Sequence, residues 1–442
     1  MLEITLVIVA IMLVLLLLGF PMKVPLLMSA LVVMIAFFPD VDPRIMIQQW
    51  IGGITPGSLV AVPMFILAAD VMTRGQAANR LLDAVMSCVG HLRGGLPITS
   101  AISCTVFGAI SGSTQATVVA VGGPLRPRLL KAGYSDSFTS ALIINASDIA
   151  LLIPPSIGMI VYGVVAQVSI GDLFIAGIGP GLMILLFFCI YCYIASIRLN
   201  IPRLQKATTD ERNVALKRAL WPLGFPIIII GGIYGGFFSP TEAAAISVGY
   251  AVLLETVVFR ELKMHDLRSI ALNSGLITAV VFVLVGAGAA FSWVISFAEL
   301  PGFLISLDET SGYWTILLTI AVAYFIGCMF VDPIVVILIL TPIFAPIAAA
   351  AGIDPILVGV IVTMQVAIGS ATPPFGCDIF TAIAIFRRPY LEVIRGTPPF
   401  IAILLVSALL VMIFPQIALG LGEVPEWLSS FFEIDRGVHN EP

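Results

Sequence analysis

Asn145-Ala-Ser-Asp-Ile-Ala-Leu-Leu-Ile-Pro-Pro-Ser-Ile-Gly158 and the related stretch Gln365-Val-Ala-Ile-Gly-Ser-Ala-Thr-Pro-Pro-Phe-Gly376 decide how this chain folds. Each places a Pro-Pro pair and small polar residues inside a segment that is otherwise apolar enough for a lipid bilayer. Proline removes a backbone donor and disfavours helix in the preceding residue, so each pair breaks its helix. Backbone opened at membrane depth is tolerated only where protein covers it or a wet cavity adjoins it. We interpret the two stretches as two halves of one transport site.

The composition places the chain in a membrane. Its 442 residues are 60% hydrophobic and 11% charged, with a mean hydropathy of +1.11, whereas soluble domains carry roughly 25% charged residues. Several uncharged runs reach the ~20 residues that a helix needs to cross the hydrocarbon, and a barrel would show shorter, alternating segments. We expect an all-α polytopic membrane protein. Its first run, Leu2 to Phe20, lacks the basic start and cleavage site of a signal peptide, so we expect a retained helix.

Lysine and arginine in short loops mark the cytoplasmic side. The basic segments are Lys23, Arg74 to Arg93, Arg126 to Lys131, Arg198 to Arg218, Arg260 to Arg268 and Arg387 to Arg395. The segments assigned to the opposite side are Asp40 with Asp42, Ser239 to Glu242, Glu299 to Glu309 and the tail from Glu423. This map predicts a multi-pass protein of a bacterial inner membrane with both termini in the periplasm.

Two runs begin and end on the same side of this map. Leu96 to Gly123 lies between basic segments and is too short for two full spans, while Trp314 to Ala351 begins and ends outside. We therefore expect two re-entrant helical hairpins that open from opposite faces. A shift of 219 residues also aligns Pro154-Pro155 with Pro373-Pro374. An inverted-topology repeat with paired broken helices indicates a secondary transporter whose site lies near the midplane.

The first hairpin tip, Gly108-Ala-Ile-Ser-Gly-Ser-Thr-Gln115, has the chemistry of an ion site. Its glycines let backbone approach a ligand, and its hydroxyl and carbonyl oxygens suit Na+. The helix that opens after the tip presents amides that favour an anion. The alternative is that these small residues merely pack helices together, as they do in membranes.

Three acids are candidates because a carboxylate at membrane depth costs upward of ~2.5 kcal/mol. Asp332 occupies the second tip and could contact Na+, cap the following helix with Pro333 at its first position, or do both. Asp148 could coordinate Na+, accept a substrate hydroxyl or ammonium, or pair with Arg128. Asp378 flanks the second break in the same way.

These features define two candidate sets. The candidate substrate-binding residues are Ser111, Asn145, Ser147, Asp148, Pro155, Ser156, Thr372, Pro374 and Asp378. The candidate Na+ ligands are Ser111, Gly112, Ser113, Thr114, Gly327, Asp332, Gly369 and Thr372.

The sequence carries no nucleophile-base-acid set, phosphate loop or metal-ligand cluster. The three histidines lie in basic loops or the tail, and the Cys189 and Cys192 pair has no partner pair beside it, so we expect surface histidines and structural thiols. We expect no cofactor, no ATP hydrolysis and no nucleic-acid partner. The energy for transport must come from an ion gradient or an external partner, or transport uses no energy source at all.

The sequence resembles the large membrane subunit of tripartite ATP-independent periplasmic (TRAP) transporters, the DctM-like permeases. The motifs that carry the resemblance are Ser111-Gly-Ser-Thr-Gln-Ala-Thr117, Ile153-Pro-Pro-Ser-Ile157, Gly235-Gly-Phe-Phe-Ser-Pro-Thr-Glu-Ala-Ala-Ala245 and Thr372-Pro-Pro-Phe-Gly376. The resemblance spans Leu13 to about Leu419.

The resemblance implies a Na+-coupled importer of small organic acids, mainly dicarboxylates or sialic acids. The departures described below extend the expected cargo to sugar acids and zwitterionic solutes. Its implied partners are a small membrane subunit and a soluble periplasmic substrate-binding protein. A transport domain that holds both hairpins and both broken helices would move like an elevator against a scaffold. On this scheme Glu242 caps a helix and does not touch substrate.

The expected organisation follows from that scheme. Its segments are scaffold helices over 1–95, first-repeat transport elements over 96–197, a cytoplasmic linker over 198–218, scaffold helices over 219–268, a second-repeat scaffold helix and outer loop over 269–312, second-repeat transport elements over 313–397, and a C-terminal helix with a periplasmic tail over 398–442.

Two departures from the family pattern bear on the cargo. Family members usually have Gly-Thr or Gly-Ser in place of Ser147-Asp148, and often Asn in place of Asp378. Extra acids beside the cavity argue against a simple dianion and favour a cationic or multiply hydroxylated solute, such as an amino acid, an ectoine-like solute or a sugar acid. Two alternatives remain: a stand-alone carboxylate symporter of related fold, and an intramembrane enzyme that uses Asp148 and Asp378 as a catalytic pair.

Overall fold

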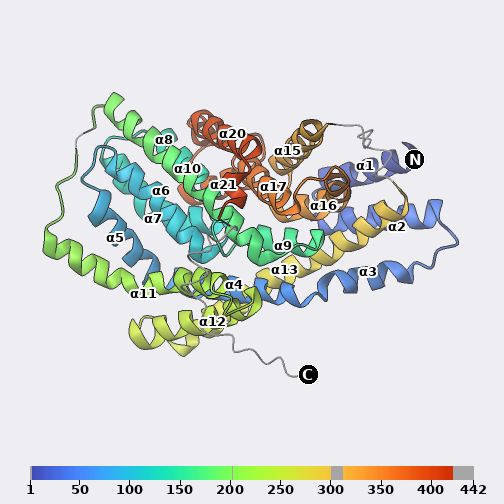
Figure 1. Cartoon of the computed structure of the whole chain (residues 1–442), viewed down its shortest axis with the longest axis horizontal. Coiled ribbons are helices and arrows are strands. Elements are labelled where there is room, and N and C mark those ends of the chain that lie inside the picture. The colour runs from blue at the N-terminus through green and yellow to red at the C-terminus, as the bar shows by residue number, and fades with distance from the viewer. Residues whose placement is uncertain (1, 202, 300–311, 422–442) are drawn as a thin grey trace, which may run out of the picture.

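The computed structural model describes residues 2–201, 203–299 and 312–421, and within these ranges the chain is helical with short connections (Figure 1). The helices of the first half are α1 Leu2–Leu17, α2 Lys23–Phe37, α3 Arg44–Ile54, α4 Ala61–Arg74, α5 Ala77–Val89, α6 Gly95–Ser111, α7 Thr114–Lys131, α8 Asp136–Ser147, α9 Ile157–Ala166 and α10 Ile170–Arg198. Those of the second half are α11 Thr209–Tyr234, α12 Pro240–Leu253, α13 Met264–Phe297, α15 Tyr313–Phe330, α16 Pro333–Ala350, α17 Pro355–Ser370, α18 Cys377–Phe386, α19 Tyr390–Ile394, α20 Pro398–Ile413 and α21 Gln416–Leu419. Single turns η1 Gly57–Val60, η2 Asp148–Leu151 and η3 Leu254–Val258 extend their neighbours.

Seven of the described helical segments are long and apolar enough to cross a membrane, and they include α10, α11, α13, α15 and α16. Much of the remaining apolar sequence forms shorter helices, such as α8, α9, α17 and α18. This confirms the prediction of an all-helical, polytopic membrane protein. The short helices are the pieces that the Pro-Pro breaks produce.

The predicted hairpins and breaks are present as helical elements. The tip between α6 and α7 is Gly112-Ser113, and the tip between α15 and α16 is Val331-Asp332. Between α8 and α9 lies a break that contains Pro154-Pro155, and between α17 and α18 a break that contains Pro373-Pro374; both Pro-Pro bonds are cis. That the hairpins re-enter the membrane from opposite faces stays a prediction.

The internal repeat extends to the helix boundaries. The shift of 219 residues carries α7 onto α16 along its whole length, and carries the first residue of α8 onto the first residue of α17. Packing is also exchanged between the two copies, because α7 packs against α18 while α16 packs against α9. Each hairpin therefore contacts the broken helix of the other repeat, which is the reciprocal pairing that a two-fold relation would give.

The remaining helices surround this repeat. In Figure 1, α13 runs beside α2, α3 and α4 and reaches α16, and α12 lies along α4. Close packing of α13 against α3 depends on small residues, since a Cβ atom at Gly53 would collide with Ala289 and one at Gly286 would collide with Trp50. The repeat is thus adjoined by α4 and α5 at its first hairpin and by α13 at its second.

Several helices are longer than the charge map suggested. The basic segment from Arg74 to Arg93 contains α5, and Arg126 to Lys131 forms the last turns of α7. Within the expected linker over 198–218, residues 199–201 and 203–208 are non-helical, and α11 already begins at Thr209. Thr208 begins α11 early because its side chain and that of Glu211 form a capping box.

Two smaller predictions are confirmed. Glu242 caps α12, since its carboxylate accepts the backbone N–H of Ser239 at 2.8 Å while Ser239 Oγ accepts the N–H of Glu242. All six cysteines are free, and Cys192 is buried. The predicted tail and most of the predicted outer loop before α15 lie outside the described residues.

Candidate functional site

The first hairpin tip is fastened to the first break. Gly112 has φ 59°, a left-handed conformation suited to glycine, and a Cβ atom there would collide with the carbonyl oxygen of Pro155. The N–H of Ile157 donates to the carbonyl oxygen of Gly112 at 3.4 Å. Ser111 Oγ lies 3.0 Å from Thr117 Oγ1, and Ser113 caps α7 by accepting the N–H of Ala116. The tip is therefore ordered by its own hydroxyls and by the break behind it.

The second tip repeats this arrangement with different chemistry. Asp332 caps α16, with its Oδ1 accepting the N–H of Ile334 at 3.0 Å, and Pro333 is the first residue of the helix. The N–H of Phe375 in the second break donates to the carbonyl oxygen of Met329 at 3.2 Å. Each break thus contacts its own hairpin, and the predicted capping role of Asp332 is confirmed.

Asp378 joins the two repeats. Its carboxylate is fully buried and accepts two hydroxyl hydrogen bonds, from Thr114 Oγ1 at 2.8 Å and from Ser370 Oγ at 2.6 Å. Thr114 is the first residue after the first tip, whereas Ser370 ends α17 in the second repeat. Hydrogen bonds to a charged group are the strong ones, so this acid fixes the first tip against the second break.

Asp148, at the first break, has no such partners. It is 1% exposed, and within the described residues neither carboxylate oxygen has a hydrogen-bond partner. The neighbouring polar side chains bond within their own helix: Ser147 Oγ donates to the carbonyl of Ile143, and Asn145 Nδ2 donates to that of Ala141. In the described part of the chain, Asp148 does not pair with Arg128.

A cavity of about 650 Å³ lies in front of both tips. Its lining comes from the first tip (Ser111 to Ala116), from the second tip (Asp332 to Val335), from Leu151, Ile157 and Gly158 around the first break, and from α2, α4 and α13. This volume falls in the range of about 300–1,000 Å³ that is usual for small-molecule sites. The cavity can hold a small solute between the hairpin tips and the helices around them.

Only some of the predicted site residues reach this cavity. Those that line it are Ser111, Gly112, Ser113, Thr114 and Asp332. Those that lie outside its lining are Asn145, Ser147, Asp148, Pro155, Ser156, Gly327, Gly369, Thr372, Pro374 and Asp378. Within the second group, Ser156 caps α9, and Gly369 packs so closely against α15 that a Cβ atom there would collide with Cys328.

Two charged residues of the cavity wall were missed by the sequence reasoning. Lys23 is the first residue of α2, and Asp70 lies near the end of α4. Asp70 Oδ2 accepts a hydrogen bond from Ser274 Oγ of α13 at 2.6 Å. Asp70 is an acid within the otherwise apolar run from Ile47 to Met72, which is itself a signal for a polar site, but it lies far along the chain from the Pro-Pro breaks.

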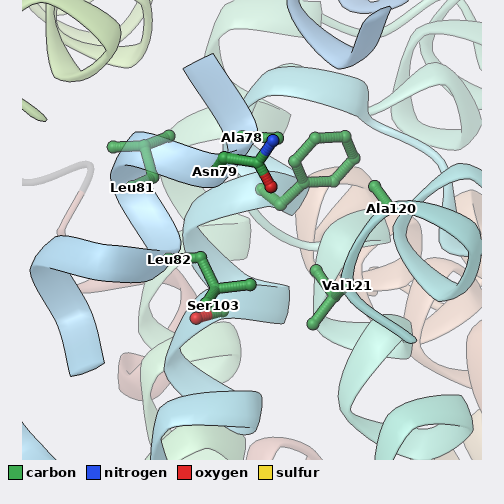
Figure 2. Close-up of a pocket in the computed structure, with 8 residues that line it drawn as sticks. Ala78, Asn79, Leu81, Leu82, Ser103, Ala120 and Val121 are labelled. Atoms are coloured by element: carbon green, nitrogen blue, oxygen red, sulfur yellow. The ribbon is translucent and has the colours of Figure 1, made fainter. Parts of the chain in front are cut away.

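A second hollow can be set aside. Figure 2 shows a crevice where Asn79 and Leu82 of α5 lie near Ser103 of α6 and Val121 of α7. Its volume is about 10 Å³, which is roughly the space of one water-sized sphere. The crevice records how α5 packs on the first hairpin, and it cannot hold a solute.

The fold and the cavity define a polytopic helical transporter with paired hairpins and broken helices. More particularly, the chain belongs to the DctM component of the tripartite ATP-independent periplasmic transporters, whose family model matches residues 9–417. This confirms the family resemblance. The members are transport permeases, so the chain is not expected to act as an intramembrane enzyme.

Relatives with assigned names cover nearly the whole chain. It is 63% identical to the ectoine TRAP transporter large permease protein TeaC of Halomonas elongata, over 95% of this chain and 99% of the relative. It is 61% identical to the ectoine/5-hydroxyectoine large permease UehC of Ruegeria pomeroyi, over 93% and 97%. Identity to the C4-dicarboxylate permease DctM of Pseudomonas aeruginosa is 37%, over 84% and 87%.

A solved structure shares the fold. The crystal structure of the Alcanivorax borkumensis YdaH transporter superposes with a TM-score of 0.57 at 15% identity, covering 86% of this chain and 89% of that chain. At this identity the likeness concerns the arrangement of helices and carries no information on the solute.

Proposed function

We propose that this chain is the large permease of a Na+-driven importer of ectoine, acting with a small membrane subunit and a periplasmic binding protein in a bacterial inner membrane. The proposed solute rests on a contrast in sequence identity. The chain is more than 60% identical to two permeases named for ectoine but 37% identical to one named for C4-dicarboxylates. Ectoine is a small cyclic zwitterion, which agrees with the expectation of a cargo that is not a plain dianion.

An elevator movement is supported by how the cavity is bounded. On one side both hairpins and both breaks are joined into one block. Asp378 bonds to Thr114, Ile157 bonds to Gly112, and Phe375 of the second break bonds to Met329 of the second hairpin. On the other side lie α2, α4 and α13. A solute bound between these groups would move across the membrane with the block while α4 and α13 stay in place.

The charge map suggests which way the cavity opens. Arg74 ends α4, Arg268 lies in the first turns of α13, and the bond between Asp70 and Ser274 holds these two ends side by side. Basic residues favour the cytoplasmic side. We therefore assign this structure to an inward-open state.

Na+ coupling is supported by the oxygen atoms at the tips. The hydroxyls of Ser111 and Ser113 and the carboxylate of Asp332 lie on or beside the cavity, and such hard oxygen donors suit Na+. Replacing Ser113→Ala or Asp332→Asn should raise the Na+ concentration needed for half-maximal uptake more than it lowers expression. An unchanged Na+ dependence in both variants would contradict the proposed role of the tips.

Reconstitution tests the whole proposal. Proteoliposomes that contain the large and small subunits, supplied with the binding protein, should take up labelled ectoine when a Na+ gradient is imposed. Succinate in excess should compete poorly. Uptake that prefers succinate, or ectoine uptake that ignores the Na+ gradient, would contradict the assigned solute or the assigned driving ion, respectively.

A further inference from the structure

The cavity wall opposite the hairpin tips carries one positive and one negative side chain. Lys23 and Asp70 both line the cavity, and both are partly buried. They come from α2 and α4, which are separate helices of the surrounding group. Among the described residues, neither takes part in an ion pair, with the other or with a third residue.

Local helix stability does not explain Lys23. It occupies the first position of α2, where the helix dipole disfavours a positive charge. The positive charge of Lys23 therefore destabilises the folded protein unless an ion of opposite charge binds beside it. In this cavity the ligand group would be an anion.

Asp70 is held in place by one neutral contact. Ser274 Oγ donates to its Oδ2 at 2.6 Å, which orients the carboxylate, and among the described residues Oδ1 has no hydrogen-bond partner. Ser274 cannot neutralise the charge. A cationic group of a solute could do so, in surroundings where apolar residues of α13 lower the effective dielectric constant and strengthen the attraction.

We propose that Lys23 and Asp70 form a dipolar recognition site for a zwitterionic solute, with Lys23 facing its carboxylate and Asp70 facing its cationic group. The inference deepens the proposed function and rests on it, because ectoine joins a carboxylate to a cyclic amidinium. A dicarboxylate would place its second negative charge toward Asp70, and this repulsion would exclude it. The site therefore selects by charge from the side of the cavity that the hairpins do not form.

The test measures binding without the periplasmic protein, so that its own specificity does not enter. Labelled ectoine is bound to the large and small subunits in proteoliposomes, and unlabelled ectoine or cyclohexanecarboxylate displaces it. The second compound keeps a ring and a carboxylate but lacks the cation. Asp70→Asn should weaken ectoine binding about tenfold, the loss expected for one hydrogen-bonded charge, and should leave the affinity of cyclohexanecarboxylate unchanged or higher.

Lys23→Gln should lower the affinity for both ectoine and cyclohexanecarboxylate, because both compounds carry the carboxylate that Lys23 would contact. The controls are Asp40→Asn and Lys131→Gln, which remove exposed charges outside the cavity lining and should change neither affinity. Ser274→Ala should weaken ectoine binding less than Asp70→Asn does, since it removes only the orienting hydroxyl.

The outcomes separate this inference from the function on which it rests. If the wild-type complex binds ectoine and Asp70→Asn leaves its affinity unchanged, the proposed function stands and the dipolar site is wrong. If Asp70→Asn weakens both compounds in proportion, the residue has a structural role and the inference is also wrong. If the wild-type complex binds no ectoine while it transports another solute, both proposals fail.

Discussion

The two broken helices share the same backbone interruption but differ in the hydrogen bonding of their buried aspartates. Each contains a Pro-Pro pair, contacts its own hairpin and carries a buried aspartate. At the second break, Asp378 accepts hydrogen bonds from Thr114 and Ser370. At the first break, both oxygens of Asp148 lack a partner in the described part of the chain.

This difference suggests that the two acids, one in each repeat, have different roles: one stabilises the fold and the other serves transport. A buried carboxylate with two donors stabilises the structure that surrounds it, whereas a buried carboxylate without donors costs free energy. We infer that Asp378 holds the two repeats together. Asp148 is retained for something that the folded chain alone does not supply, such as a cation or a proton.

The largest expected loss of stability comes from Asp378→Ala. It removes two hydrogen bonds to a charged acceptor, each worth about 1.5–3 kcal/mol, so the free energy of unfolding should fall by about 3 kcal/mol or more. Equilibrium unfolding in mixed SDS micelles measures this change. Ser370→Ala, which removes one of the two donors, should cost about half as much; equal stability of Asp378→Ala and wild type would remove the distinction between the breaks.

A smaller loss is expected from Asp136→Ala, which tests whether contacts between the repeats are general. Asp136 begins α8 and accepts from Arg126 Nε and Nη2 at 2.9 and 2.6 Å and, across the repeats, lies 2.7 Å from Nε of Arg388. The pair with Arg126 is mostly buried, whereas the side chain of Arg388 is 45% exposed.

We expect Asp136→Ala to lower the unfolding free energy by about 2 kcal/mol, and Arg388→Met to lower it by less than 1 kcal/mol because solvent screens that pair. The same SDS titration measures both. A loss from Arg388→Met as large as that from Asp136→Ala would mean that the contact between the repeats, and not the buried pair with Arg126, determines the strength.

The two hairpin tips should differ less than the two breaks. Ser113 and Asp332 are equivalent helix caps, and replacing such a cap by alanine costs about 1 kcal/mol. Ser113→Ala and Asp332→Ala should therefore lower the unfolding free energy by similar amounts in the absence of Na+. A loss at Asp332 several times larger than at Ser113 would show that its charge supports the fold beyond capping.

The features that could be predicted from the sequence are those with local causes. A Pro-Pro pair breaks a helix regardless of its surroundings, so the breaks at Pro154-Pro155 and Pro373-Pro374 follow from the sequence alone. The glycines and hydroxyl residues of the first tip likewise predict a turn. The start of α11 could also have been predicted, because Thr208 and Glu211 have the spacing of a capping box. Counting the basic residues that follow as a loop obscured that signal.

The features that could not be predicted depend on contacts between distant segments. Asp70 meets Ser274 across 204 positions, and Thr114 meets Asp378 across 264. No local pattern states which polar side chains face the cavity. Ser147 was a reasonable candidate, yet its hydroxyl bonds to a carbonyl of its own helix, a common outcome for serine in an apolar helix.

The smallest expected effect on stability, and the sharpest contrast, belongs to Asp148→Asn. The amide has nearly the same shape as the carboxyl group and replaces a buried acid that has no hydrogen-bond donor within the described residues, so the unfolding free energy should stay within about 0.5 kcal/mol of wild type or rise. Transport should fall nevertheless, if the charge serves a cation or a proton during the cycle. The matched variant Asp378→Asn should lose stability first and transport with it. A loss of stability in Asp148→Asn as large as that in Asp378→Asn, in the same SDS titration, would mean that both acids are structural and that the repeats do not divide these tasks between them.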